Sequence, residues 1–139
     1  TLNERSLTAM NALGRHILAE YYSCDISALD NITFLEKCMR DAVVASGATI
    51  IDTKFHQFSP YGVSGVIVIA ESHMAIHTWP EYGYAAIDFF TCGDRVDPWK
   101  AFDHMSLTLK PLNHSTKEIK RGLLAPETDK LLEAPPLTL

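Results

Sequence analysis

Three short apolar segments follow one another in the middle of the chain, and they restrict its fold more than any other feature. Their sequences are VSGVIVIA (63–70), MAIHTW (74–79) and YAAIDFFTC (84–92). Pro80 and Gly83 interrupt the chain between the second segment and the third. Strongly apolar runs of this length are typical of strands in a sheet that helices cover on one face. We therefore predict consecutive strands of one mostly antiparallel sheet.

Three further segments have the composition of strands: 14–25, 48–58 and 114–122. In the first of them, Ile17, Ala19 and Tyr21 alternate with other residues and are expected to share one face. The second ends at the turn signature Ser-Pro-Tyr-Gly, residues 59–62. The third is expected at an edge of the sheet, which then has roughly six strands.

Two segments carry the period of an amphipathic helix. Asp30 is the candidate cap of a helix over 31–46, and Gly47 supplies its left-handed stop. The apolar positions of this helix recur every three or four residues; they are Ile32, Leu35, Met39, Ala42 and Val43. Asp97 and Pro98 begin the second helix, as its cap and its first-turn proline. The apolar side of that helix consists of Trp99, Phe102, Met105 and Leu109.

These elements predict an α+β fold, a two-layer α/β sandwich with a mostly antiparallel sheet and two main helices on one face. The length of 139 residues fits a single domain spanning 1–139. Within it we expect a loose N-terminal extension over 1–12 and a proline-broken C-terminal tail over 121–139. Two helices leave the other face of such a sheet uncovered. Because runs such as GVIVIA are poorly suited to water, we expect that face to be used in dimerisation.

The composition excludes several classes of protein. A net charge of −5 and a pI near 5.6 argue against nucleic-acid binding, which needs a basic face for the phosphates. No apolar run approaches the roughly 20 residues that cross a bilayer, and no signal-peptide pattern opens the sequence. We therefore expect a cytoplasmic protein with no membrane partner. The three cysteines, Cys24, Cys38 and Cys92, are widely spaced and without a CxxC pair, which favours free thiols over disulfides or structural zinc.

Reactive side chains are concentrated where the first two apolar segments meet. Glu71 and Ser72 lie at this junction. A serine hydroxyl at a strained bend can attack the carbonyl of the preceding residue and turn the amide into an ester. β-Elimination would then separate 1–71 from 72–139, and the serine remnant would lose ammonia to become a pyruvoyl cap. His77, five positions on, is a candidate for the base that removes the serine α-hydrogen if the chain folds back.

The segment ESHMAIHTWPEYGYAAIDFFTCGD, residues 71–94, resembles the core of the short bacterial and archaeal S-adenosylmethionine decarboxylases, which are pyruvoyl-dependent proenzymes. The similarity extends from LGRHILAEYYSCD through SGATIIDTKFHQFSPYGVSGVIVIAESH to VDPWKAF, about residues 13–102. The Glu-Ser pair, His-Thr-Trp-Pro-Glu and Phe-Thr-Cys-Gly all occur in order. The resemblance implies a carboxy-lyase that decarboxylates S-adenosylmethionine and supplies the aminopropyl donor for spermidine biosynthesis.

The resemblance also implies roles for individual residues in cleavage and catalysis. The chain would cleave itself between Glu71 and Ser72, and Ser72 would become the covalent pyruvoyl cofactor. That group would form a Schiff base with the substrate amine and act as an electron sink. His77 and Ser64 resemble the pair that assists self-cleavage, His77 as the base and Ser64 as a hydrogen-bonding partner to the intermediate. Cys92 resembles the general acid that returns a proton to the α-carbon after decarboxylation.

The same resemblance implies the substrate-binding residues and the assembly. Phe58 matches an aromatic residue that stacks on adenine, and Glu81 matches a carboxylate that holds the ribose hydroxyls. Because Phe58 and Ser64 precede the cleavage point and the others follow it, the site needs both fragments, and we expect a homodimer. No metal and no pyridoxal phosphate are expected. His73 and His77 have a metal-ligand spacing for a helix, but on a strand they stand about 13 Å apart, too far for one zinc ion.

Two other functions are compatible with these residues. A pyruvoyl-dependent arginine or ornithine decarboxylase would keep Ser72, His77 and Cys92 and differ only in its pocket. Glu81 would suit a guanidinium as well as ribose hydroxyls, whereas Phe58 favours a nucleoside. The third candidate is a binding or regulatory homologue that never cleaves, and such a protein would remain one intact chain.

Overall fold

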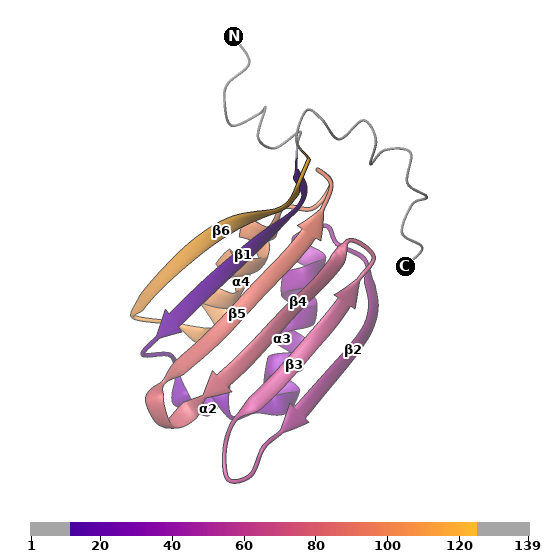
Figure 1. Cartoon of the computed structure of the whole chain (residues 1–139). Helices are drawn as coiled ribbons and strands as arrows, with labels where there is room; N and C mark the ends of the chain where they lie inside the picture. The colour runs from indigo at the N-terminus through magenta and orange to yellow at the C-terminus, as the bar shows by residue number, and fades with distance from the viewer. Residues whose placement is uncertain (1–11, 125–139) are drawn as a thin grey trace.

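The computed structural model describes residues 12–124, and the predicted α+β fold is confirmed: one sheet carries its helices on one side (Figure 1). In chain order the elements are β1 (Ala12–Tyr22), α2 (Ile26–Leu29), α3 (Ile32–Ala45), β2 (Ile50–Gln57), β3 (Val63–Ile69), β4 (Ser72–Trp79), the 3₁₀ turn η1 (Pro80–Tyr82), β5 (Tyr84–Cys92), α4 (Pro98–Leu109) and β6 (Asn113–Leu123). The extension predicted over 1–12, apart from its last residue, and the tail from 125 onward lie outside the described residues.

The strands form one antiparallel sheet in the order β2-β3-β4-β5-β1-β6. The three apolar segments are adjacent in it as β3, β4 and β5, as predicted. β6 lies at an edge, also as predicted, but it continues to Leu123. Ala12 pairs with Leu123, so both ends of the described chain take part in the sheet. Residues 121–123 therefore belong to a strand and not to the predicted tail.

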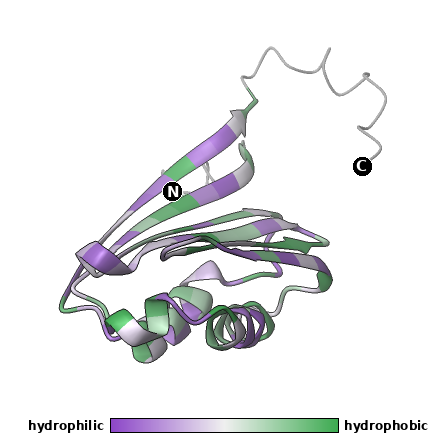
Figure 2. Cartoon of the chain, turned by 90° about the horizontal axis from the view of Figure 1, so that it is seen from below, coloured by the Kyte–Doolittle hydropathy of each residue, from purple (hydrophilic) through white to green (hydrophobic). Residues whose placement is uncertain are grey.

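The hydrophobic core lies between the sheet and the helices, all of which pack on one side (Figure 2). Alternate residues of the central strands point into it and are almost completely buried: Ile17, Ala19, Tyr21, Val63, Ile67, Met74, Ile76, Ala85, Ile87 and Phe89. The helices contribute Leu35, Met39, Ala42, Val43, Phe102, Met105 and Leu109. Burial of these apolar side chains is the main term that holds the two layers together.

Asn31, and not Asp30, caps α3. The Asn31 side chain accepts a hydrogen bond from the Phe34 N–H at 3.0 Å. Both residues are good caps, so the sequence pattern did not distinguish these neighbours. Asp30 has a different role: its carboxylate accepts the Gly62 N–H at 2.8 Å. It therefore fastens the β2–β3 loop, which carries Phe58, to the helix layer.

The sequence pattern does not predict two short elements, α2 and η1. The strand expected over 14–25 stops early because Ser23 takes a left-handed conformation, with φ 54°. Asp25 then accepts the Ser27 N–H at 3.1 Å and caps α2. η1 follows β4 and ends at Gly83, which is left-handed with φ 63°. Helices of three or four residues are too short to display a helical period in the sequence.

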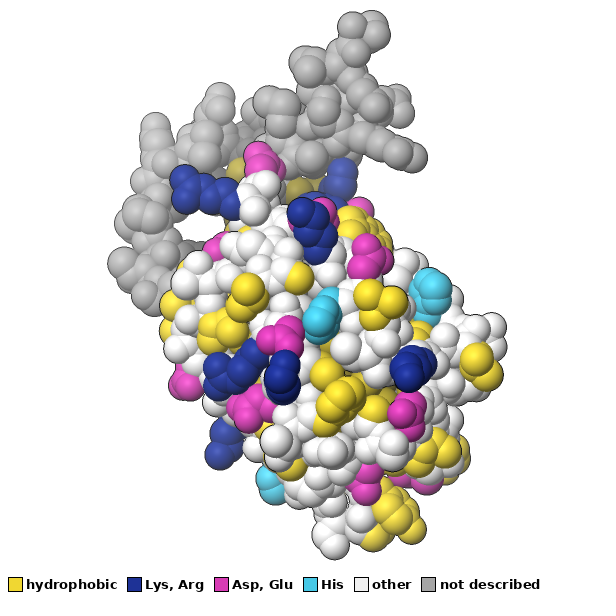
Figure 3. All heavy atoms as spheres, turned by 180° about the vertical axis from the view of Figure 1, so that it is seen from behind, with side chains coloured by type: hydrophobic (Ala, Val, Ile, Leu, Met, Phe, Trp, Pro, Cys, Tyr) yellow, Lys and Arg dark blue, Asp and Glu magenta, His cyan; other side chains and the backbone are white. Residues whose placement is uncertain are grey.

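The remaining helix ends agree with the sequence. Gly47 follows α3 with φ 86°, and Asp97 caps α4 by accepting the Trp99 N–H at 3.1 Å. The outer side of the helix layer carries acidic and basic side chains scattered among apolar ones, as a solvated surface does (Figure 3). In the described part of the chain no helix is long and apolar enough to cross a membrane.

Candidate active site

The side of the sheet that faces away from the helices, which we call the open face, carries many of the polar side chains of interest. Because side chains alternate along a strand, the residues between the buried positions point to this side. On the central strands they include Ser64, His73, His77, Asp88 and Phe90. Apolar residues also remain accessible on this face, among them Val68 (44% exposed), Trp79 (40%) and Leu18 (36%).

Ser64 and His77 form a hydrogen-bonded pair on the open face. They lie directly opposite each other on β3 and β4. The Ser64 hydroxyl oxygen is 2.7 Å from His77 Nδ1. Both residues line a cavity of about 290 Å³ together with Phe58 and Glu81. The structure therefore brings together four of the predicted site residues, which supply a basic nitrogen, a hydroxyl, an aromatic ring and a carboxylate.

Two short connections position the ring and the carboxylate at this cavity. In the β2–β3 loop, the Phe58 N–H donates to the Gly62 carbonyl at 2.8 Å, and Asp30 accepts hydrogen bonds from Gly62 and Gln57. The Phe58 side chain lies outside β2 and is 47% exposed. Glu81 lies in η1, where Pro80 fixes the first turn. Both groups thus reach the cavity from the same end of the sheet.

A second group of predicted residues lies at the hairpin between β3 and β4. Ser72 begins β4 with φ 146°, a region that non-glycine residues rarely adopt and that costs about 1–3 kcal/mol. The backbone N–H of Cys92 donates to the carbonyl oxygen of Glu71 at 3.0 Å. A hydrogen bond to this oxygen withdraws electron density from the carbonyl carbon and makes it more open to attack. The positive φ of Ser72 therefore supplies the backbone strain that the self-cleavage hypothesis requires at this bend.

The structure separates the two groups within one protomer. Ser72 and His77 are the ends of five consecutive steps along β4, which stays extended throughout. At the rise of a β-strand, five steps span about 16 Å. The expectation that the chain folds back and lets His77 reach Ser72 is therefore wrong for a single protomer. Glu71, Ser72 and Cys92 lie at one end of β4, and the Ser64–His77 cavity lies at the other.

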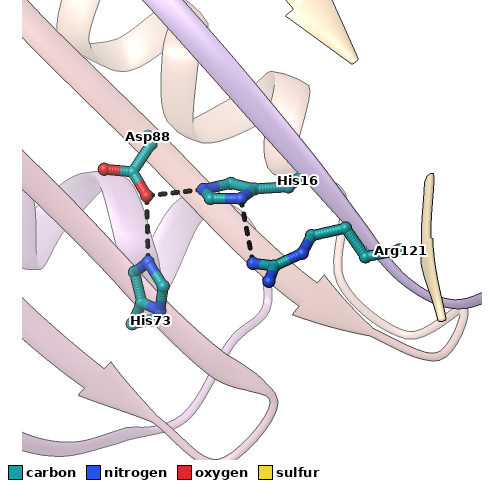
Figure 4. Close-up of polar contacts among 4 residues, drawn as sticks. All are labelled: His16, His73, Asp88 and Arg121. Atoms are coloured by element: carbon teal, nitrogen blue, oxygen red, sulfur yellow. Dashed lines mark hydrogen bonds and ion pairs between the residues drawn. The ribbon is translucent and has the colours of Figure 1, made fainter. Parts of the chain in front are cut away.

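A further cluster, which the sequence pattern does not predict, joins residues of four strands, β1, β4, β5 and β6, on the open face (Figure 4). Asp88 Oδ2 lies 2.7 Å from His16 Nε2 and 2.9 Å from His73 Nε2. Arg121 Nη1 is 3.5 Å from His16 Nδ1, and its guanidinium lies over the Phe90 ring. The cluster depends on the pairing of strands far apart in the sequence: His16 and His73 both lie opposite Phe90.

Two histidines and a carboxylate are also a common set of metal ligands, and these three ligand atoms lie within 4.8 Å of one another. Arg121 argues for a different interpretation. Because a guanidinium only donates, it favours the tautomer of His16 in which Nδ1 accepts and Nε2 carries the proton. That proton is then donated to Asp88, and Nε2 has no lone pair for a metal. The geometry favours a hydrogen-bonded network.

The cysteines divide into two kinds. Cys24 and Cys38 are buried, whereas Cys92 is exposed, and all three are free. Burial raises the pKa of the Cys24 thiol to about 11. Burial also raises the pKa of Cys38. Cys92 is therefore the one thiol of this chain that lies beside the predicted cleavage point and is open to solvent.

Comparison with known proteins decides the family. The model of the S-adenosylmethionine decarboxylase family matches residues 15–122. The chain belongs to this family. The S-adenosylmethionine decarboxylase proenzyme of Thermotoga maritima is 58% identical over 113 residues, which are 81% of this chain and 87% of that protein. The proenzyme of Caldicellulosiruptor saccharolyticus is 55% identical over 114 residues, 82% of this chain and 92% of that protein.

A solved structure agrees with this assignment. The adenosylmethionine decarboxylase of Aquifex aeolicus has a TM-score of 0.79 and 35% sequence identity, covering 86% of this chain and 98% of that one. The family model also extends beyond residues 13–102, the segment whose motifs carry the resemblance in the sequence. It reaches residue 122 and so includes nearly all of β6.

Proposed function

We propose that this chain is the proenzyme of a pyruvoyl-dependent S-adenosylmethionine decarboxylase. The observation that carries the proposal is the bend at Ser72, where a strained serine follows a carbonyl already held by the Cys92 N–H. A turn serine without a chemical role would have no need of the unfavourable φ. The family and the names of the relatives support this activity over that of an arginine or ornithine decarboxylase.

Self-cleavage follows from atoms that the bend brings together. Ser72 Oγ attacks the carbonyl carbon of Glu71, the C–N bond breaks, and an ester replaces the amide. Removal of the Ser72 α-hydrogen expels the Glu71 carboxylate and leaves a dehydroalanine at position 72. Addition of water and loss of ammonia then give the pyruvoyl end of 72–139. Strain relieved at Ser72 and the hydrogen bond to Glu71 both favour the first step.

The residues of the bend fit this group. In the mature protein its carbonyl would supply an electron sink for decarboxylation of an amino acid substrate. The Cys92 side chain, exposed beside the bend, would deliver the proton to the substrate α-carbon. Phe58 would stack on adenine and Glu81 would hold the ribose hydroxyls. Ser64 would keep the His77 ring oriented through the 2.7 Å hydrogen bond, so that its other nitrogen is free to act as the base.

We infer that the site is completed by a second copy of the chain, because Ser72 and His77 are about 16 Å apart along an extended strand. Two copies that pack through their open faces about a two-fold axis lying across the strands place the Ser72 end of one against the His77 end of the other. The accessible apolar residues of the open face support such packing. The homodimer would then contain two equivalent sites, each built from both protomers.

Substrate identity is tested with purified, self-cleaved protein. Release of carbon dioxide from S-adenosylmethionine, arginine and ornithine is compared at equal concentrations. We expect turnover of S-adenosylmethionine alone, because the cavity at Phe58 and Glu81 offers a nucleoside an aromatic face and a carboxylate. Turnover of arginine or ornithine alone would contradict the proposal and favour a basic amino acid as substrate.

The shared site is tested by complementation. Ser72→Ala and His77→Ala chains carrying different tags are co-expressed, and mixed dimers are isolated through both tags. Neither variant alone should cleave. In the mixed dimer, one site has Ser72 from one chain and His77 from the other, so the His77→Ala chain should be cut. Absence of cutting in the mixed dimer, with normal cutting of the wild type, would contradict the shared site and leave the decarboxylase assignment standing.

A further inference from the structure

Thr91, next to the predicted proton donor Cys92, carries a buried hydroxyl group. It lies on β5 directly opposite Ser72 and is only 1% exposed. Within residues 12–124 its hydroxyl oxygen is the one buried side-chain polar atom without a hydrogen-bond partner. An unpaired buried hydroxyl is destabilising and uncommon. Thr78 has the usual arrangement: its hydroxyl donates to the Leu29 carbonyl at 2.7 Å and accepts the Val63 N–H at 2.9 Å.

The neighbouring hydrogen bond places the Thr91 hydroxyl beside the atoms that react. Cys92, the next residue, donates to the Glu71 carbonyl at 3.0 Å. In an antiparallel ladder, hydrogen-bonded pairs alternate with closer pairs whose Cα atoms are about 4.5 Å apart. Since Glu71 and Cys92 share a hydrogen bond, the next pair, Ser72 and Thr91, is of the closer kind, in which side chains approach each other. Ser72, the Glu71 carbonyl and the unpaired hydroxyl of Thr91 therefore belong to neighbouring positions of the two paired strands.

We propose that Thr91 is a positioning residue for self-cleavage, whose hydroxyl accepts a hydrogen bond from the Ser72 hydroxyl in the conformer that attacks Glu71. This inference rests on the proposed function and adds a residue to it. Ser72 Oγ forms its bond to the Glu71 carbonyl carbon, the bond from that carbon to the Ser72 nitrogen breaks, and the Oγ proton ends on the nitrogen. Thr91 exchanges no atom. It directs the serine hydrogen away from the carbonyl, so that an oxygen lone pair faces the carbon.

The proposal accounts for the missing partner. The Thr91 hydroxyl is unpaired in the conformer described here because its partner, the Ser72 hydroxyl, arrives only when the serine side chain turns toward the Glu71 carbonyl. The destabilisation of an unpaired group in the resting chain is then relieved on the way to the attack, which lowers the barrier relative to a fully satisfied resting state.

The test measures cleavage and stability separately in full-length chains. Cleavage is followed as the appearance of 72–139 after pulse-labelled synthesis in a cell-free system. Thr91→Val should cleave roughly tenfold more slowly than the wild type, and Thr91→Ser, which keeps the hydroxyl, should restore most of the rate. Thr108→Val is the matched control, since the Thr108 hydroxyl lies on α4 and donates to the His104 and Met105 carbonyls of that helix, and it should cleave at the wild-type rate.

Stability is compared in a Ser72→Ala background, where every chain is uncut. Thr91→Val should equal or raise the thermal midpoint, because a methyl group replaces an unpaired hydroxyl. Thr78→Val should lower the midpoint, because its hydroxyl is fully bonded.

Three results would overturn the inference: wild-type cleavage by Thr91→Val, a Thr91→Ser chain as slow as Thr91→Val, or a lowered midpoint for Thr91→Val that accounts for slow cleavage by misfolding. A wild-type chain that stays intact would instead overturn the proposed function, and this inference with it.

Discussion

Ser72 and His77 occupy opposite ends of one continuous strand, β4, although only four residues separate them in the sequence. The two ends have different hydrogen bonds. The Cys92 N–H donates to the carbonyl of Glu71, the residue before Ser72, and the Ser64 hydroxyl is hydrogen-bonded to His77. One end of β4 therefore carries the bond to be cut, and the other end carries the base and the cavity for the substrate.

At the Ser72 end, Cys92 should be the one thiol that reacts rapidly. Iodoacetamide at pH 8 should add a single label, and the label should lie on 72–139, because burial raises the pKa of both Cys24 and Cys38. Decarboxylation should be lost as the label is added, and substrate should slow the labelling. Mass spectrometry of the two fragments measures this directly. Label on 1–71, or full activity of a completely labelled protein, would contradict the assignment of Cys92 as proton donor.

At the other end, Asp30 should affect substrate binding through the loop that carries Phe58. Asp30→Ala removes the acceptor for the Gly62 N–H and should raise KM about tenfold with little change in kcat, since the loop loses its attachment. Asp30→Asn keeps an oxygen acceptor and serves as the control, with KM close to that of the wild type. Steady-state kinetics on S-adenosylmethionine provide both constants. A fall in kcat at unchanged KM would place the role of Asp30 elsewhere.

The His16–Asp88–His73 cluster predicts that metal removal has no effect. Dialysis against EDTA should leave decarboxylation unchanged, and added Zn²⁺ should not raise the thermal midpoint, because the tautomer that Arg121 favours places a proton on His16 Nε2, which then donates to Asp88. Calorimetric titration with Zn²⁺ gives an independent reading. Loss of activity in EDTA that a divalent cation restores would show that the cluster binds a metal.

Alkaline pH should destabilise the fold through Cys24. Its thiol has an ordinary pKa of 9.0 in the unfolded chain and about 11 when buried. Above pH 9 the unfolded chain therefore releases a proton that the folded chain retains. The resulting stability is complete below pH 9 and is lost as the pH rises through 11, to a limit of about 3 kcal/mol, since each of the two pKa units corresponds to about 1.4 kcal/mol.

Denaturant unfolding at pH 8 to 11 measures this dependence. In Cys24→Ala, the free energy of unfolding should fall much less steeply between pH 9 and 10. Cys38 and the buried Tyr21, whose pKa values are also raised, account for the fall that remains. An identical slope in Cys24→Ala would show that the thiol is not the group responsible.

Much of the fold was predictable because its signals are local. Alternation gave the buried face of β1, and the adjacent Asp97 and Pro98 gave the start of α4. The exact ends of helices and strands were not predictable, since the neighbours Asp30 and Asn31 are equally good caps. In the structure Asn31 caps α3, whereas Asp30 accepts a hydrogen bond from the loop at Gly62. The short helix α2 has no period to detect.

The site was predictable in its residues but not in its arrangement. The motifs named Ser72, His77 and Cys92, yet a spacing of five positions says nothing about distance until the strand is known to stay extended. The cluster at Asp88 and the unpaired hydroxyl of Thr91 depend on strand register and burial, which no local pattern encodes.

The most direct test of this account is the mass of the purified protein under denaturing conditions. We predict two fragments, 1–71 with a free carboxylate and 72–139 with a pyruvoyl group in place of its amino terminus, and a single chain for Ser72→Ala. Protein that decarboxylates S-adenosylmethionine while its backbone is intact between Glu71 and Ser72, with no carbonyl that borohydride can trap, would contradict the central claim.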